Sequence, residues 1–192
     1  MRMLSSEDGT YPMLGYGALG GVATYLLGFL VTYVWKAPAV ADALRGVNLI
    51  ANFLGIDAVP TWRGVGWLFY NAHFVQTRVP GPGGPTFTDF LTRTEQGWLL
   101  TILVPVLLIA AGAVVAHRTD GSESIGRAAI HGGAVGVGYL PLAAAGAVLT
   151  AQPIADTGAK IGPDLIPAVL LAGLAYPLLF GAIGGALFAV IR

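Results

Sequence analysis

The chain has 192 residues, of which 55% are hydrophobic and 10% are charged, against about 25% charged in soluble globular domains. Ten basic and ten acidic residues give a formal net charge of zero, so no basic patch argues for nucleic acid as a partner. The absence of cysteine excludes disulfides, thiolate metal sites and cysteine nucleophiles. The composition predicts a protein of the lipid bilayer.

The first apolar segment, residues 13–35, has the length of a transmembrane helix. A cleaved signal peptide is the alternative, because Ala37–Ala41 reads APAVA and offers small residues to a peptidase. However, the segment is longer than the apolar core of about 7–15 residues in a signal peptide, and the acidic Glu7 and Asp8 precede it. We therefore expect a retained membrane helix.

Residues 36–96 form a long connection that we expect to lie as a cap on one membrane face. Apolar residues recur every three or four positions from Pro38 to Ile56, which predicts an amphipathic helix whose apolar stripe must be covered by the bundle, a partner or the bilayer interface. A second helix, aromatic on all sides, is expected over Trp62–Arg78, at headgroup level or half inserted. Its interfacial residues are Trp62, Trp67, Tyr70 and His73. The sequence PGPGGP at 80–85 predicts an exposed turn or hinge.

Three further spans are predicted at residues 97–116, 127–150 and 165–191. Thr92 and Glu95 have the spacing of a capping box for the second span, and Asp164 precedes the fourth as an N-cap. Four spans put both termini on one side of the membrane, and the arginines of the short hairpins favour the cytoplasm. The expected fold is an all-α integral membrane protein forming a single membrane domain over 1–192. It has four transmembrane helices plus amphipathic or interfacial helices in the long first loop.

Small residues recur at intervals of four on three of these spans, which predicts close helix packing. The glycines concerned are Gly20, Gly28, Gly132, Gly136, Gly181 and Gly185. Such contacts serve a compact bundle, a homo-oligomer or a membrane protein partner equally well. Prolines inside the spans, at positions 105, 141, 167 and 177, predict kinks.

Two histidines are candidates for a cofactor site, because the hairpin between the second and third spans brings His117 and His131 to the same membrane face. Two imidazoles there would suit a haem or a metal, but ordinary interfacial polar residues fit equally, and no span supplies an Asp or Glu as a third ligand. We therefore expect no cofactor and no metal. For His73 a hydrogen-bonded structural role is expected.

Catalytic residues are not identifiable in this sequence. The span centres contain no unambiguous Asp, Glu, Lys or Arg, which argues against ion-coupled transport and against acid–base catalysis in the membrane. Phosphate-binding loops, nucleophile elbows and His-Glu-x-x-His motifs are absent. The notable polar groups of the spans are expected to bond to nearby backbone carbonyls; they are Thr24, Thr32, Thr101, Tyr25 and Tyr139.

The charged residues are biased in kind: eight arginines stand against two lysines, and seven aspartates against three glutamates. With the lack of cysteine and the excess of Ala, Gly and Val, the chain resembles small multi-pass membrane proteins of halophilic archaea. That resemblance implies a location in the cell membrane but no activity. The leading hypothesis for function is a non-enzymatic structural or accessory subunit of a membrane assembly. The alternative is a facilitator or channel for a small solute, lined by the kinked third and fourth spans.

Overall fold

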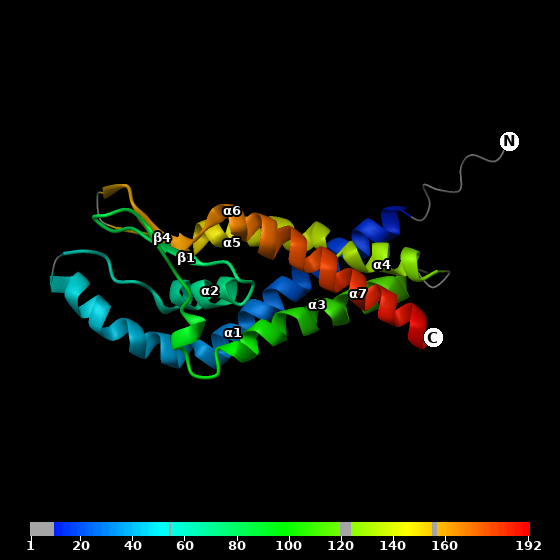
Figure 1. The fold of residues 1–192 in the computed structure, drawn as a ribbon, viewed down its shortest axis with the longest axis horizontal. Helices are drawn as coiled ribbons and strands as arrows, with labels where there is room; N and C mark the ends of the chain where they lie inside the picture. Colours follow the sequence, from blue (N-terminus) through cyan, green and yellow to red (C-terminus); the bar gives the residue numbers. More distant parts are fainter. Residues whose placement is uncertain (1–9, 54, 120–123, 155–156) are drawn as a thin grey trace.

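The computed structural model describes residues 10–53, 55–119, 124–154 and 157–192. Four helical segments in it are long and apolar enough to cross a membrane: Thr10–Phe53, Trp98–Arg118, Ile125–Leu149 and Leu165–Ile191. They pack side by side into an elongated bundle, with the start of the first and the end of the last at the same end (Figure 1). The expectation of four candidate spans is therefore confirmed.

The first helix, α1 (Thr10–Phe53), is twice the expected length because it continues through Pro38. The separate amphipathic helix predicted from Pro38 to Ile56 is wrong in its boundary: it is the second half of α1. A proline inside a helix removes one hydrogen bond, but here the following turns are held by packing. A Cβ on Gly64 would lie 2.7 Å from Cγ1 of Val40, so the next helix, α2 (Thr61–Asn71), lies directly against this part of α1.

The second span, α3 (Trp98–Arg118), begins at Gly97 without a side-chain cap. The predicted capping box is wrong, because residues 91–93 form a separate 3₁₀ turn, η1 (Leu91–Arg93), and the hydroxyl of Thr92 donates to the carbonyl of Asp89. Local turn bonds there compete with the cap. Asp164 does precede the fourth span as expected, although its side chain makes no capping bond.

The last two spans are irregular. The third is divided into α4 (Ile125–Gly133) and α5 (Gly136–Leu149), with the break at residues 134–135 and not at Pro141, which lies inside α5. The fourth consists of α6 (Leu165–Pro167), a π-helical segment η4 (Ala168–Ala175), and α7 (Tyr176–Ile191). In α4 the hydroxyl of Ser124 accepts a hydrogen bond from the amide of Arg127, 3.2 Å away.

A small antiparallel sheet lies at the other end of the bundle, so the all-α expectation is wrong in this respect. Its strands are β1 (Thr77–Val79), β2 (Thr86–Thr88), β3 (Gln152–Pro153) and β4 (Lys160–Pro163), in the order β2-β1-β4-β3. The central pair, β1 and β4, joins the first long connection to the connection between the last two spans. Strands of two to four residues are too short for an alternating hydrophobic pattern to identify them.

Close helix contacts are made through glycine. A Cβ on Gly132 would lie 2.2 Å from the carbonyl oxygen of Gly181, and one on Gly185 would lie 2.0 Å from that of Ala128, so α4 and α7 touch backbone to backbone. The helices α1 and α5 meet in the same way, through Gly21 and Gly138. The other glycines of the predicted set face side chains: Gly20 faces Val115, Gly28 faces Phe69, and Gly136 has ordinary contacts with Leu178.

Candidate functional site

The helix α2 is inserted between α1 and α5 at the end of the bundle that carries the sheet (Figure 1). Two glycines allow it to come close. Gly64 faces Val40 of α1, and a Cβ on Gly66 would lie 2.3 Å from the methyl carbon of Thr150, just after α5. Most of the remaining side chains are buried, among them Val65, Phe69 and Tyr70, none of which is exposed to solvent. α2 is therefore part of the core of this end of the bundle.

A tight turn ends α2 and sends the chain back out toward β1. The amides of Ala72, His73 and Phe74 bond to carbonyls of the last helical turn, and Phe74 has a positive φ of 59°. Asn71 holds the turn closed: its amide nitrogen donates to the carbonyl of Val75 at 2.7 Å, and its side-chain oxygen accepts from the amide of Phe90 at 2.9 Å. The helix predicted over 62–78 ends at this turn, because Asn71 bonds to the backbone beyond it.

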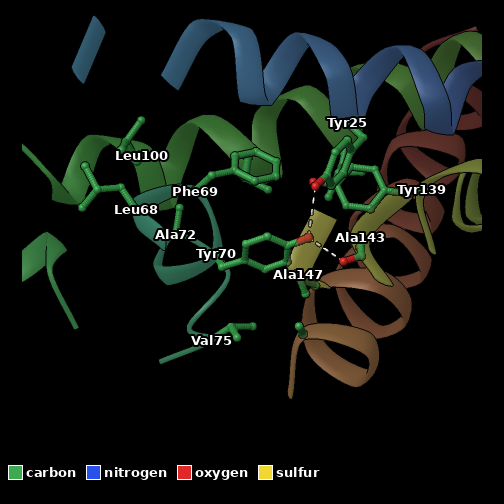
Figure 2. Packing of buried hydrophobic residues seen from close by; sticks show 14 of the residues in the cluster. Tyr25, Leu68, Phe69, Tyr70, Ala72, Val75, Leu100, Tyr139, Ala143 and Ala147 are labelled. Atoms are coloured by element: carbon green, nitrogen blue, oxygen red, sulfur yellow. Dashed lines mark hydrogen bonds between the residues drawn. The ribbon is translucent and has the colours of Figure 1, made fainter. Parts of the chain in front are cut away.

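The end of α2 brings Phe69 and Tyr70, and the turn after it brings His73, against two tyrosines of the spans, Tyr25 of α1 and Tyr139 of α5. We call these five residues the buried aromatic cluster. Figure 2 shows the hydroxyl of Tyr70 between Tyr25 and the backbone of Ala143. It donates to the carbonyl of Ala143, which leaves its oxygen to accept from the hydroxyl of Tyr25 at 3.0 Å. Gly146 makes this arrangement possible, since a Cβ there would lie 2.0 Å from the Tyr25 hydroxyl.

His73 forms the second polar connection in the buried aromatic cluster. Its Nδ1 lies 2.8 Å from the carbonyl oxygen of Phe69, and its Nε2 lies 2.7 Å from the hydroxyl of Tyr139. A carbonyl only accepts, so Nδ1 carries the proton and donates, while Nε2 accepts from Tyr139. The rings meet mainly edge to face, with centroids 5.2 Å apart for Tyr25 and Phe69 and also for Tyr25 and Tyr139. This is the favoured geometry for buried aromatic pairs.

The polar groups of the cluster are all hydrogen-bonded within the protein. They are three phenol hydroxyls and one imidazole. Complete burial lowers the pKa of His73 from 6.5 to about 4, although its bond to the Phe69 carbonyl opposes this, so the ring is neutral at pH 7. Among the described residues, no group of three or more His, Cys, Asp or Glu side chains is placed to hold a metal ion. The site contains neither an activated nucleophile nor a free base.

Acid is expected to destabilise the wild type through His73. Below pH 6.5 the unfolded chain binds a proton that the folded chain does not take up until about pH 4. The stability is therefore complete above pH 6.5 and falls by roughly 3 kcal/mol as the pH drops toward 4. In detergent, the unfolding midpoint of His73→Gln should be lower at pH 7 but should fall less steeply over this range. Equal slopes for the two proteins would show that His73 is not the titrating group.

Among the four aromatic-cap residues named from the sequence, only Trp62 keeps a large exposed fraction, 39%. Its ring lies 5.2 Å from the guanidinium carbon of Arg63. Trp67, Tyr70 and His73 are buried inside the protein, so these three side chains contact other parts of the chain and are not exposed as interfacial residues would be. Trp67 stacks on Phe90, and its indole nitrogen donates to the carbonyl of Thr150 at 2.9 Å. Packing against α1 and α5 thus buries most of these rings.

The two histidines considered for a cofactor lie at the opposite end of the bundle and have separate partners. Nδ1 of His131 lies 2.7 Å from the hydroxyl of Thr119. The ring of His117 packs against Phe188 of α7, with centroids 5.2 Å apart. Neither contact forms part of a group of three or more His, Cys, Asp or Glu side chains among the described residues, and the expectation that this pair of candidates holds no cofactor stays a prediction.

Sequence reasoning placed the span hydroxyls correctly in three cases: Thr24, Thr32 and Thr101 donate to the carbonyls of Gly20, Gly28 and Trp98. It missed Tyr25 and Tyr139, which were expected to bond to nearby backbone but bond to Tyr70 and His73. The available signal was the presence of tyrosines within apolar spans, since a buried phenol needs a partner. Nothing in the sequence identified that partner.

The chain matches one family along nearly its whole length. Residues 4–192 match the family of unknown function DUF7978, and the chain belongs to it. No curated protein and no solved structure matches the chain.

Proposed function

We propose that this DUF7978 protein is a multi-pass membrane protein that acts as a non-enzymatic accessory subunit and binds a protein partner outside the bilayer. The observation that carries the proposal is an uncovered apolar surface on the second half of α1, residues 38–53, which we call the α1 arm. At about 1.5 Å per residue, 44 residues of helix extend roughly 66 Å, twice the hydrocarbon thickness of about 30 Å. Part of α1 therefore has to lie outside the hydrocarbon.

The arm is the part that leaves the bundle. It runs on along the long axis of the molecule, at the end where β1 and β4 lie (Figure 1). Just before it, Lys36 is buried, and its ammonium donates to the carbonyl of Glu95 at 2.7 Å, at the start of α3. Along the arm, Asp42 and Arg45 form an exposed ion pair with 2.7 Å between their charged atoms. Charges at these positions favour water over lipid around the arm.

Among the described residues, the apolar stripe of the arm is covered along one side only. Val40 and Leu44 face Gly64 of α2. Further along, Val47, Ile50 and Phe53 are 54%, 62% and 84% exposed. Exposed apolar residues are normal on the spans, which face lipid, but the arm points away from them, and contiguous apolar surface in water marks an interaction site. A partner with a complementary apolar groove would bury this row as a helix-in-groove contact.

The bundle interior also supports a role without transport or catalysis. The buried aromatic cluster fills the space between α1, α2 and α5 with rings, and each of its polar atoms is hydrogen-bonded. A solute path through this region would have to break these bonds. The glycine contacts between α4 and α7 likewise leave no room between the two backbones.

Purification of the full chain from its native membranes in mild detergent tests the proposal. The wild type should retain a stoichiometric protein, and the double variant Ile50→Glu with Phe53→Glu should retain at least about tenfold less. Asn52→Glu is the control, because it adds a negative charge to the polar face of the arm, where the double variant adds two charges to the apolar face, and it should retain the partner. The thermal stability of the double variant should equal that of the wild type, since both positions are exposed. Retention of no partner by the wild type, or equal retention by the double variant, contradicts the proposal.

A facilitator for a small apolar solute is the second candidate. It is favoured by an open apolar hollow of about 540 Å³ next to the break between α4 and α5, with Gly133, Val137, Leu174 and Leu178 in its lining. The π-helical segment η4 borders the same hollow, and such segments often occur at functional sites. Proteoliposomes containing the purified chain alone decide between the two. Flux of a small solute above that of empty liposomes supports the facilitator, and no flux supports the accessory role.

The proposal extends to the location of the protein. We infer the cell membrane of a halophilic archaeon from the arginine and aspartate bias, with both termini in the cytoplasm. The start of α1 and the end of α7 lie together at the end of the bundle opposite the sheet (Figure 1), which supports termini on one side. Reporter fusions at the two termini that report opposite sides would contradict this topology.

A further inference from the structure

A hollow of about 380 Å³ lies beside the small sheet, between the β1–β2 turn and the connection that leads into β4. Two of its lining residues are cations, Arg78 of β1 and Lys160 of β4, and the described lining contains no acidic side chain. The rest of the wall is Gly, Pro and Ala. Its volume lies within the range of about 300–1,000 Å³ that is usual for small-molecule sites.

The sheet register places the two cations on one face. Arg78 lies opposite Gly162, and Lys160 precedes Gly162 by two positions on the same strand. Side chains two positions apart point to the same face of a sheet. Arg78 and Lys160 are therefore diagonal neighbours, whose backbones in a regular sheet lie about 7–8 Å apart. Long side chains can span that distance. Both are exposed, so their charged groups are able to converge on one ligand in the hollow.

Neither cation forms an ion pair within the described part of the chain, and this includes Asp164, which lies two positions after Gly162 and so on the same face as Arg78. The ion pair found there is Arg45–Asp42, on the α1 arm. Asp156, the acidic residue nearest to Lys160 on the N-terminal side, lies outside the described residues. Two like charges held together on one sheet face repel each other, and a bound anion would relieve this repulsion.

The loops around the hollow depend on glycine. Gly84 in the β1–β2 turn has a φ of 108°, and Gly158 before β4 has a φ of 71°, both in the region that favours glycine. A Cβ at Gly84 or Gly158 would meet no atom within 4 Å, so glycine is required by the backbone and leaves the hollow open.

We propose that this hollow binds the phosphate group, or a similar oxyanion, of a ligand between Arg78 and Lys160. The arginine fork suits two oxygens of one phosphate, and the lysine supplies a point charge. Two sources of such a group fit the position: a soluble phosphate compound and the headgroup of an anionic lipid. The lipid source is within reach because only Asp164 separates the end of β4 from the fourth candidate span. The inference does not depend on the accessory role.

Two probes test the site with the full chain in detergent. Inorganic phosphate is titrated calorimetrically at constant ionic strength, and phosphatidylglycerol is compared with phosphatidylcholine by native mass spectrometry. With at least one probe, the double variant Arg78→Gln with Lys160→Gln should bind at least about tenfold more weakly than the wild type. Binding should also weaken as salt is added, because the cations are exposed. Phosphate binding identifies a soluble ligand, and selective binding of phosphatidylglycerol identifies a lipid.

Arg93→Gln is the matched control, since it removes one exposed cation from the same connection without touching the hollow. It should bind both probes like the wild type. The single variant Lys160→Gln, at an exposed position, should show an intermediate loss even if the double variant folds poorly. The site is overturned if the wild type binds neither probe, or if Lys160→Gln and the double variant bind like the wild type.

Discussion

Replacement of Gly185 by leucine is expected to prevent α7 from packing on α4. The first added carbon would lie 2.0 Å from the carbonyl oxygen of Ala128. A backbone atom cannot relieve this clash by changing rotamer, as a side chain can. The two helices must move apart at this contact, so we expect the free energy of unfolding to fall by about 3 kcal/mol, the upper end of the usual cost of overpacking. Loss of monodisperse protein in size-exclusion chromatography and a lower midpoint of denaturation in detergent would measure this.

Gly15→Leu is the matched control for that experiment. Gly15 lies in α1, in the same kind of apolar helix, and a Cβ there would meet nothing within 4 Å. The same substitution should therefore leave the unfolding midpoint nearly unchanged. If Gly185→Leu behaves like Gly15→Leu, the backbone contact between α4 and α7 does not hold the bundle together.

Phe69→Ala is expected to release α2 from the bundle. The ring is completely buried and lies edge-on to Tyr25 and His73, with centroid distances of 5.2 Å and 4.9 Å. Removing a buried phenylalanine of this kind lowers the free energy of unfolding by about 3–5 kcal/mol, because a cavity remains where the ring was. The loss is measurable by denaturation in mixed micelles, and proteolysis within residues 80–85 should become faster as the turn loosens.

Phe74→Ala is the control from the same turn. The side chain of Phe74 is 67% exposed. A positive φ is unfavourable for alanine as it is for phenylalanine, so the substitution should change the free energy of unfolding little. Equal losses for Phe69→Ala and Phe74→Ala would mean that α2 is held by its backbone and not by the buried ring.

The sequence was most informative about the spans. A run such as Gly97–Ala116 contains twenty residues and no charge, and the structure places α3 within two residues of these boundaries. The boundaries of the helices inside the long connection, residues 36–96, were harder to predict. Pro38 favours the start of a new helix, but the packing of Gly64 on Val40 keeps the chain helical through it. The cost of a proline inside a helix, about 3 kcal/mol, is outweighed by such packing contacts.

The candidate site was predictable only as a set of residues that need partners. The aromatic composition of residues 62–78 was visible, but whether those rings face lipid headgroups or one another depends on what lies beside them. The end of α2 brings Tyr70 to Tyr25, 45 positions away in the sequence, and the turn after α2 brings His73 to Tyr139, 66 positions away. No pattern within α2 carries information about such distant partners.

Length, apolarity and small-residue spacing were sufficient to determine four membrane-length helices that pack closely, because those properties follow from the local chain and from the thickness of a bilayer. The tertiary structure alone decided that α2 is buried, that β1 pairs with β4, and that the α1 arm stays uncovered. Each of these depends on contacts between distant segments, whose free energy exceeds the local preferences that a sequence displays.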